Sequence, residues 1–333
     1  MKGSWSVMAA GIAMAMAAAS PVRAQSSACP SGAQGSAAQV AQDGCQQAVD
    51  VFNYMAPQLG AAIAGGNATL GQGGTLGGFP HFSIGLRANA VAATLPQVDQ
   101  FTQSVTGAQQ QTLPTKDNQP LPMPVVDAAI GIWSGIPLGV TNVAGIDLLV
   151  NAAYIPDVTK NNLSVKAPNG SLKLGYGVRV GIIQESVELP GVAVTYLKRD
   201  LPVVTLQGTS GGNTFDVSNV NISTTAYRLV ASKHFVIFGL AAGIGQDKYS
   251  QAANVQATVN VLGQAFTSPQ VSASQDVTRT NMFGDLSINL PVFKLIGEIG
   301  QVSGGSVSTY NTFAGKAANA SRLYGSVGLR LAW

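Results

Sequence analysis

Charged side chains are scarce in this sequence. They make up 10% of its 333 residues, against about 25% in ordinary soluble domains, and the mean hydropathy of +0.23 is high for a soluble surface. Long apolar runs are nevertheless missing beyond the first 24 residues. The most apolar later stretch, residues 128–154, is interrupted by Pro137, Asn142 and Asp147, whereas a membrane-spanning helix needs about 20 nearly unbroken apolar residues. The sequence therefore predicts neither an ordinary soluble domain nor a helical membrane protein.

Histidine and cysteine are also rare. Only His81 and His234 are present, and neither has a recognisable nucleophile as a partner, so the sequence predicts no catalytic residue and no enzyme. Two cysteines, Cys29 and Cys45, are too few to hold a metal without histidines nearby, and nothing indicates a cofactor. The net charge of +3 comes without a run of basic residues, so nucleic acid is not an expected partner.

The first residues have the features of a secretory signal peptide. Lys2 precedes an apolar run from Val7 to Ala19, and Val22-Arg23-Ala24 ends on small residues at the positions that a signal peptidase reads. We assign residues 1–24 to this signal. In an exported chain, Cys29 and Cys45 are expected to form a disulfide, worth roughly 3 kcal/mol in the chain-entropy model.

Residues 25–78 are predicted to form a small, partly helical unit. Residues 25–45 look irregular, whereas the apolar residues between Val49 and Ile63 recur at intervals of three and four, which is the period of a helix. Pro57 predicts a kink or two short pieces. The glycine-rich residues 65–78 end the helix. This unit is too small for a large core of its own, so we expect it to lie below a larger unit or to plug it.

From Phe79 to the end of the chain, apolar residues follow a period of two, which is the period of a β-strand. Residues 82–90 and 172–182 show it most clearly. The last strand, residues 321–333, places apolar residues on one face and Arg322 and Arg330 on the other. Periodicity alone does not tell a sandwich, whose apolar face is inside, from a membrane barrel, whose apolar face is outside.

Connection lengths favour the barrel. Tight turns near residues 136–139, 189–191, 232–234 and 290–292 alternate with longer polar connections at residues 95–124, 156–170, 201–214, 249–275 and 304–320. The count predicts an all-β fold over residues 79–333: a transmembrane antiparallel up-and-down β-barrel of about ten strands. Twelve or fourteen strands remain alternatives, because residues 216–231 change face and residues 249–275 could hold an extra hairpin.

This ensemble resembles bacterial outer-membrane β-barrel proteins. The resemblance implies the outer membrane of a Gram-negative-type bacterium, contact with membrane lipid, and an assembly machinery that reads Trp333 as its signal. A weaker likeness, carried by residues 49–78 and Phe79-Pro80-His81-Phe82, is to the long-chain fatty-acid transporter group (FadL-type barrels), in which an N-terminal segment plugs the lumen. The chain is shorter than these barrels and has fewer predicted strands, so no binding residue is carried over.

The charged residues opposite the apolar face are predicted to line the lumen: Arg87, Asp127, Asp147, Lys173, Arg179, Glu185, Arg279, Asp285, Lys294, Glu298, Arg322 and Arg330. They either pair across strands and fill a narrow barrel or line a path for a solute. We therefore expect a passive pore or transporter of small solutes, hydrophobic ones included, that residues 25–78 gate. The alternative is a closed structural or surface-binding barrel that acts through its long outer loops.

Overall fold

Strands with alternating side chains build the wall of the molecule. A computed structural model describes residues 29, 35–155, 157–160, 163–210 and 212–332, so the signal peptide assigned to residues 1–24 and the signal at Trp333 lie outside the described residues. Ten antiparallel strands pair in a closed ring. In ring order they are β1 (Phe82–Pro96), β3 (Thr115–Trp133), β6 (Ile146–Tyr154), β9 (Leu172–Ile183), β10 (Gly191–Asp200), β12 (Asn213–His234), β13 (Phe238–Val261), β15 (Val271–Asn289), β16 (Lys294–Ser303) and β18 (Arg322–Ala332).

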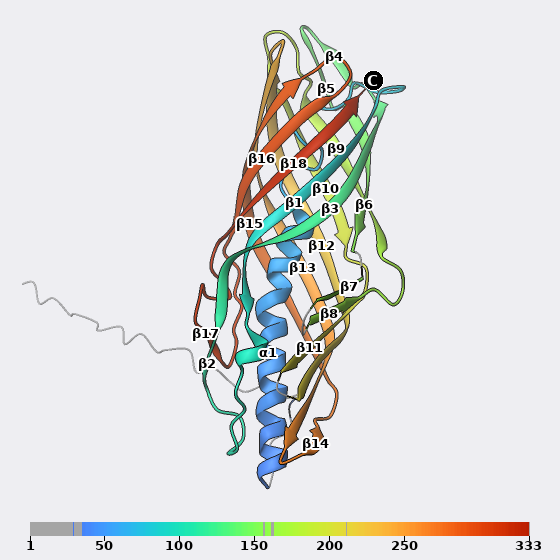
Figure 1. Ribbon diagram of the computed structural model, residues 1–333. Helices are drawn as coiled ribbons and strands as arrows, with labels where there is room; N and C mark the ends of the chain where they lie inside the picture. The colour runs from blue at the N-terminus through green and yellow to red at the C-terminus, as the bar shows by residue number, and fades with distance from the viewer. Residues whose placement is uncertain (1–28, 30–34, 156, 161–162, 211, 333) are drawn as a thin grey trace, which may run out of the picture.

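The predicted barrel of about ten strands is confirmed, and the alternatives of twelve or fourteen are wrong for the ring. Short connections join the strands at the end where β1 starts and β18 stops, which we name the short-turn end (Figure 1). The opposite end, named the long-connection end, carries small additional elements, and the short-turn end carries two more in the connection between β3 and β6. The remaining strands and the 3-10 helix are η1 (Val98–Gln100), β2 (Thr112–Leu113), β4 (Ile136–Leu138), β5 (Thr141–Val143), β7 (Val158–Lys160), β8 (Leu163–Lys166), β11 (Val204–Ser210), β14 (Gln264–Thr267) and β17 (Thr312–Phe313).

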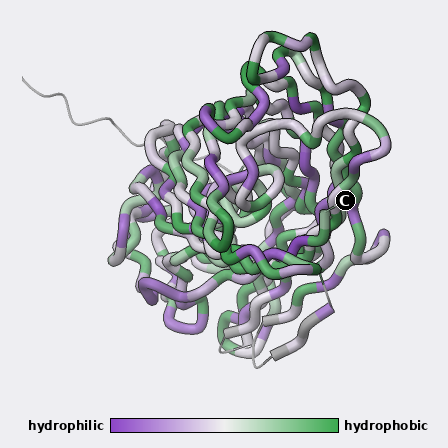
Figure 2. The backbone as a smooth tube through the Cα atoms, turned by 90° about the horizontal axis from the view of Figure 1, so that it is seen from above, coloured by the Kyte–Doolittle hydropathy of each residue, from purple (hydrophilic) through white to green (hydrophobic). Residues whose placement is uncertain are grey.

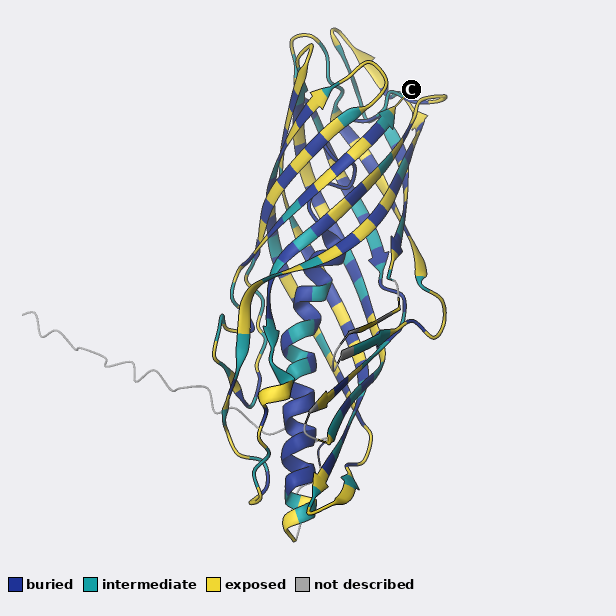
Figure 3. Ribbon diagram, in the orientation of Figure 1, coloured by how far each residue is buried: buried dark blue, intermediate teal, exposed yellow. Residues whose placement is uncertain are grey.

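The outer surface of the ring near the short-turn end is an apolar band. Large apolar side chains at alternate positions are exposed there, as the alternating colours along the strands show (Figure 3). Leu174, Tyr176, Ile299 and Val327 are each at least 60% exposed, whereas the charged residues between them point inward. A soluble protein would bury these side chains. The band therefore places a membrane around this part of the barrel, because lipid is the solvent that such a surface suits.

Beyond the band, the apolar face changes from the outside of the wall to the inside. In β12, Tyr227 and Leu229 point outward, whereas Val220 and Ile222 are buried inside. A bulge between Ser218 and Asn221 shifts the register and keeps the inner face inward beyond it. The change of the apolar face between Ile222 and Tyr227 explains why residues 216–231 change face in the sequence, since the strand alternates regularly between them. The predicted loop at residues 249–275 is wrong, because β13 and β15 continue through most of it as paired strands. The extra hairpin considered for this stretch is present, because β14 pairs with the end of β13 outside the ring.

A single helix, α1 (Ser36–Ala64), lies inside the ring and reaches out at the long-connection end (Figure 1). It begins thirteen residues before Val49, where the predicted stripe starts, so the last ten of the residues 25–45 that look irregular in the sequence are helical; Pro57 does not end the helix. Proline lacks the N–H that would bond to the carbonyl oxygen of Asn53 one turn earlier. The side-chain amide of Gln275, on β15, donates to that oxygen at 2.9 Å. The wall thus supplies the hydrogen bond that the helix lacks at this point.

Apolar packing holds the outer half of α1. Val49 and Phe52 belong to a buried cluster with Tyr249 and Val255 of β13 and Val277 of β15. Seen along the axis, the wall is a ring with further chain inside it (Figure 2). Within the described residues, no helix has both the length and the apolar character that crossing a membrane requires.

Candidate functional site

The carboxyl end of α1 is surrounded by side chains of the wall. The last carbonyl groups of a helix have no partner within it and carry the negative end of the helix dipole, and the last turn of α1 contains no basic residue. Arg199 donates to Ala64 O, Arg228 donates at 3.1 Å to both Gly65 O and Gly66 O, and Arg87 donates to Asn67 O at 2.6 Å. We name Arg87, Arg199 and Arg228 the arginine collar.

Carboxylates of neighbouring strands balance the collar. Asp127 forms an ion pair with Arg87 at 2.8 Å and accepts a hydrogen bond from Arg199 at 3.1 Å, and Arg228 pairs with Asp247. All three arginines are no more than 2% exposed. Charges buried so deeply are costly unless each has a partner, and here the partners come from both the wall and the helix. The collar therefore depends on α1 being in place.

Residues 65–78, which we name the plug segment, run from the collar to the short-turn end and are hydrogen-bonded to the wall throughout. Glu298 accepts from Asn67 N at 2.6 Å, and Asp285 accepts from Gly71 N at 2.8 Å. Farther along, Asp147 accepts from Leu76 N at 3.1 Å and is itself paired with Arg179 at 2.7 Å. The charged lining of the wall is thus satisfied largely by the backbone of the plug segment.

Glycines allow the plug segment to touch the backbone of the wall. A Cβ atom at Gly73 would lie 2.5 Å from the carbonyl carbon of Ala231, and one at Gly78 would lie 2.5 Å from Ser134 N. Side chains at these positions would collide with main chain, which cannot move aside as a rotamer can. A cavity of about 10 Å³ lies between the plug segment and the wall beside Arg87 and Arg330, which is room for about one water molecule. The lumen is closed at this level.

At the long-connection end, two aspartates of α1 hold the connections of the wall. Asp43 accepts from Ser104 N at 2.8 Å and from Gln109 N at 3.1 Å. Asp50 accepts from Tyr310 N at 2.9 Å and from the backbone and side chain of Asn311 at 2.8 Å. Burial raises the pKa of Asp50 to about 6, although these hydrogen bonds favour its charged form.

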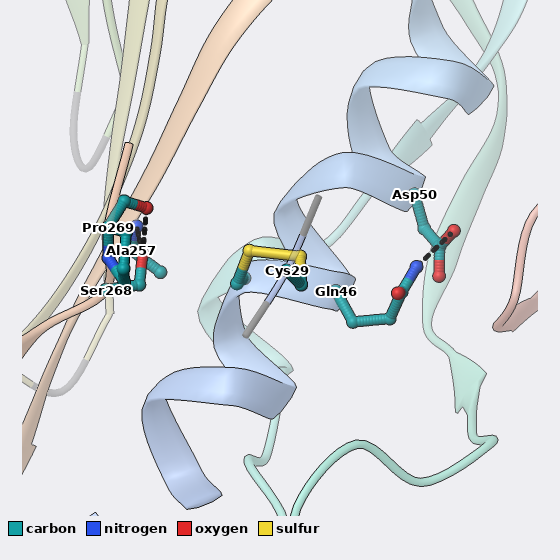
Figure 4. The surroundings of a disulfide bond; sticks show 7 residues. Cys29, Gln46, Asp50, Ala257, Ser268 and Pro269 are labelled. Atoms are coloured by element: carbon teal, nitrogen blue, oxygen red, sulfur yellow. Dashed lines mark hydrogen bonds between the residues drawn. A yellow bond between two sulfur atoms is a disulfide. The ribbon is translucent and has the colours of Figure 1, made fainter. Parts of the chain in front are cut away.

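The two cysteines are joined next to this region. The bond joins Cys29 to Cys45 of α1, which directly precedes Gln46, and the side chain of Gln46 donates to Asp50 about one turn farther along the helix (Figure 4). Their Cα atoms are 5.9 Å apart, which is within the usual range for a disulfide. The bond ties the residues that precede α1 to the helix itself.

The structure gathers most of the predicted lining residues inside the barrel. Nine are buried there: Arg87, Asp127, Asp147, Arg179, Arg279, Asp285, Glu298, Arg322 and Arg330. Glu185 and Lys294 are half-buried at the short-turn end. Lys173 is exposed near the opposite end of β9, so it lies at the mouth rather than among the buried pairs.

Arg199, Arg228 and Asp247 are central to the site, and sequence reasoning missed all three. Arg199 follows Lys198, so two adjacent charges hid which one faces inward. Arg228 has the same parity as Ala226 and the opposite parity to Tyr227, a signal that was available within residues 216–231. For Arg228, the exposed apolar neighbour Tyr227 is the informative residue, because it marks the lipid-facing side.

The two histidines lie at the short-turn end. His234 Nδ1 is 2.8 Å from Glu185 Oε2, and Ser232 Oγ donates to the same oxygen at 3.2 Å. Serine and histidine therefore share the carboxylate instead of bonding to each other, so they do not form the relay of a nucleophile and its base. No group of three or more His, Cys, Asp or Glu side chains in the described part of the chain is placed to hold a metal ion.

Sequence reasoning also overlooked a Gly-x-Ser-x-Gly spacing at residues 208–212. The motif activates its serine on a sharp turn from a strand into a helix. Gly208 and Ser210 instead lie on β11, which pairs with the following strand, β12. Their backbone does not provide the geometry of a nucleophile elbow.

Comparisons with known proteins find similarity in structure only. No family model matches the chain, and no curated protein matches it. The transport unit of the autotransporter AIDA-I from Escherichia coli aligns at 8% identity with a TM-score of 0.34, covering 85% of this chain and 99% of that one. The toluene transporter TbuX of Ralstonia pickettii, a FadL-type barrel, aligns at 12% identity with a TM-score of 0.27, covering 82% and 92%. The monoaromatic hydrocarbon channel CymD aligns at 10% identity with a TM-score of 0.27, covering 76% and 88%.

The class of protein follows from the strand pairing and the two faces of the wall. A closed ring of ten antiparallel strands, apolar outside and charged inside, is a transmembrane β-barrel of the outer-membrane type. Its lumen is occupied by α1 and the plug segment, which come from the N-terminal part of the same chain.

Proposed function

We propose that this protein is a gated passive pore of the bacterial outer membrane, closed at rest by its plug segment and open to small solutes when that segment moves. The observation that carries the proposal is the lining behind the plug segment. Asp147, Arg179, Asp285 and Glu298 would face water if the segment were displaced, and a charged lining of this kind suits an aqueous path.

The plug segment is a better candidate for the moving part than α1. The outer half of α1 is fixed by the apolar cluster around Phe52 and Tyr249 and by the loops bound to Asp43 and Asp50. The plug segment is held chiefly by hydrogen bonds, which water can replace at a net cost of about 1 kcal/mol each. Gating by displacement of residues 65–78 thus requires less rearrangement than withdrawal of the helix.

The net charge of the side chains that line the lumen indicates which kind of solute the pore would pass. Seven arginines are buried along the ring (Arg87, Arg179, Arg199, Arg228, Arg279, Arg322 and Arg330), against five carboxylates (Asp127, Asp147, Asp247, Asp285 and Glu298). This excess of two positive charges supports small hydrophilic solutes over hydrophobic ones.

A reversible covalent lock tests the gate. A Cβ atom at Gly71 would lie 3.5 Å from the Cβ atom of Ser287 on β15, a separation that a disulfide bridges. Gly71 has a φ of +68°, so any side chain there strains the closed position. We therefore expect the Gly71→Cys, Ser287→Cys double variant to show no channel openings in a planar bilayer when oxidised and to show those of the Gly71→Cys single variant after reduction. Each single variant, with and without reductant, controls for the substitutions and for reduction of the Cys29–Cys45 bond.

A second function is favoured by the long-connection end. There α1, the extended strands β12, β13 and β15, and two bound loops form a packed head beyond the apolar band. Such a head suits a closed barrel that binds a surface partner. Properly inserted protein that never conducts, even when contacts of the plug segment are weakened, would contradict the pore and favour this second function.

A further inference from the structure

The direction in which the chain passes through the barrel has a consequence independent of gating. α1 begins at the long-connection end, where Asp43 binds the backbone of the connection between β1 and β3. It ends inside the band at the arginine collar, and the plug segment continues to the short-turn end, where β1 starts at Phe82. The N-terminal part of the chain thus crosses the whole length of the barrel (Figure 1).

The two ends of the barrel face different compartments. In outer-membrane barrels the short turns are periplasmic and the long connections are extracellular. Nineteen residues separate Cys45 from Ala64 at the collar, which is about 28 Å of helix. A barrel's apolar band is about 25 Å tall, and the collar lies within it, since Leu86 and Tyr227, each next to a collar arginine, are exposed on its outer surface. The disulfide is therefore beyond the membrane on the extracellular side.

The contacts of α1 are specific for this direction. Gly44 lets the helix backbone approach Val259 and Ala257 of β13, and Gly60 lets it approach the ring of Tyr249. The connections on both sides of Asp43 and Asp50 donate backbone N–H groups to carboxylates that only a fully inserted helix presents. A helix held below the barrel would leave these groups without their partners.

We propose that the barrel carries the N-terminal part of its own chain across the outer membrane and presents the residues before Ser36 at the cell surface. The arginine collar anchors the carboxyl end of α1 inside the membrane, and the apolar cluster and the two aspartates fix its outer half. The presented element is the disulfide-closed stretch that ends at Cys45. This surface presentation holds whether or not the plug segment ever opens.

Thiol accessibility on intact cells tests this topology. Three single variants place one thiol each: Ala38→Cys at the exposed start of α1, Val105→Cys in a long connection, and Val187→Cys in the turn between β9 and β10. Val105 and Val187 are 60% and 93% exposed, so all three sites suit a membrane-impermeant maleimide. We expect the thiols at positions 38 and 105 to react on intact cells and the thiol at position 187 to react only after the outer membrane is opened.

Labelling at position 105 on intact cells, with position 38 protected until disruption, would overturn the proposal, because the N-terminus would then be periplasmic. Labelling at position 187 but not at position 105 would overturn it as well, because the barrel would then have the opposite orientation. A short epitope inserted after Ser27 gives a second readout that needs no added cysteine. Antibody binding to intact cells supports surface presentation, and binding only to opened cells contradicts it.

Discussion

Adding one methyl group at Gly73 should loosen the plug segment. A Cβ atom there would lie 2.5 Å from the carbonyl carbon of Ala231, which is about 1 Å shorter than an ordinary van der Waals distance. It would also meet the backbone nitrogen of Ser232, so both atoms that it would collide with belong to the backbone. Overpacking of this kind costs about 1–3 kcal/mol. Since the plug segment must move to relieve the collision, the cost falls on its closed position, and its opening equilibrium should rise by about 5-fold to 150-fold.

Hydrogen exchange measures this change directly, because amides of residues 65–78 exchange through local opening. We expect Gly73→Ala to raise their exchange rates by that factor while the amides of β13 stay unchanged. Gly74→Ala is the matched control, since its Cβ atom would lie 3.4 Å from the Cα atom of Gly191, an ordinary contact. Equal exchange in Gly73→Ala, Gly74→Ala and the natural sequence would refute the close seating of the plug segment against the wall.

Three further predictions concern other contacts. Gln275→Leu leaves the carbonyl of Asn53 without a partner beside Pro57, so it should lower stability by about 1–3 kcal/mol, measured by urea unfolding in detergent; an unchanged midpoint would mean that water replaces the amide. The carboxyl group of Asp50 has a higher pKa in the folded protein than in the unfolded chain, so it stabilises the bound connection fully below about pH 4, and this stabilisation is lost as the pH rises through about 6. Proteolysis of residues 304–321 should therefore be faster at pH 7.5 than at pH 4.5. Asp50→Asn should abolish that difference. Arg179→Met leaves the carboxylate of Asp147 buried without its ion pair and should cost about 3–5 kcal/mol, whereas adding Asp147→Leu should restore much of the loss; a double variant no more stable than the single one would contradict this coupling.

The sequence predicted the wall well because a lipid-facing strand has a strict two-residue period. Tyr176 and Val178 alternate with Gly177 and Arg179, and the alternating lengths of the connections distinguished a barrel from a sandwich with the same period. Prediction failed beyond the band. There Val220 and Ile222 are apolar because they contact α1 inside the barrel and not lipid outside it. The sequence of a strand does not show whether its apolar face contacts lipid or a helix.

The site was predicted only in part for a related reason. Buried charges such as Asp147 and Arg179 could be found by parity, and they pair at directly opposite positions of β6 and β9. That their remaining hydrogen bonds go to the plug segment could not be predicted. Contacts such as Leu76 N to Asp147 join a glycine-rich segment without periodicity to a strand about 70 residues away.

The disulfide at the head of α1 has a mechanical consequence. Its bond closes a covalent loop across a sequence separation of 16 residues, so a second part of the chain is joined to the helix at Cys45. For α1 to be pulled toward the periplasm, the loop would have to pass between Arg87, Arg199 and Arg228. The loop therefore blocks withdrawal of the helix through the arginine collar while the disulfide is oxidised. Once the disulfide is reduced, the same force can draw the helix through.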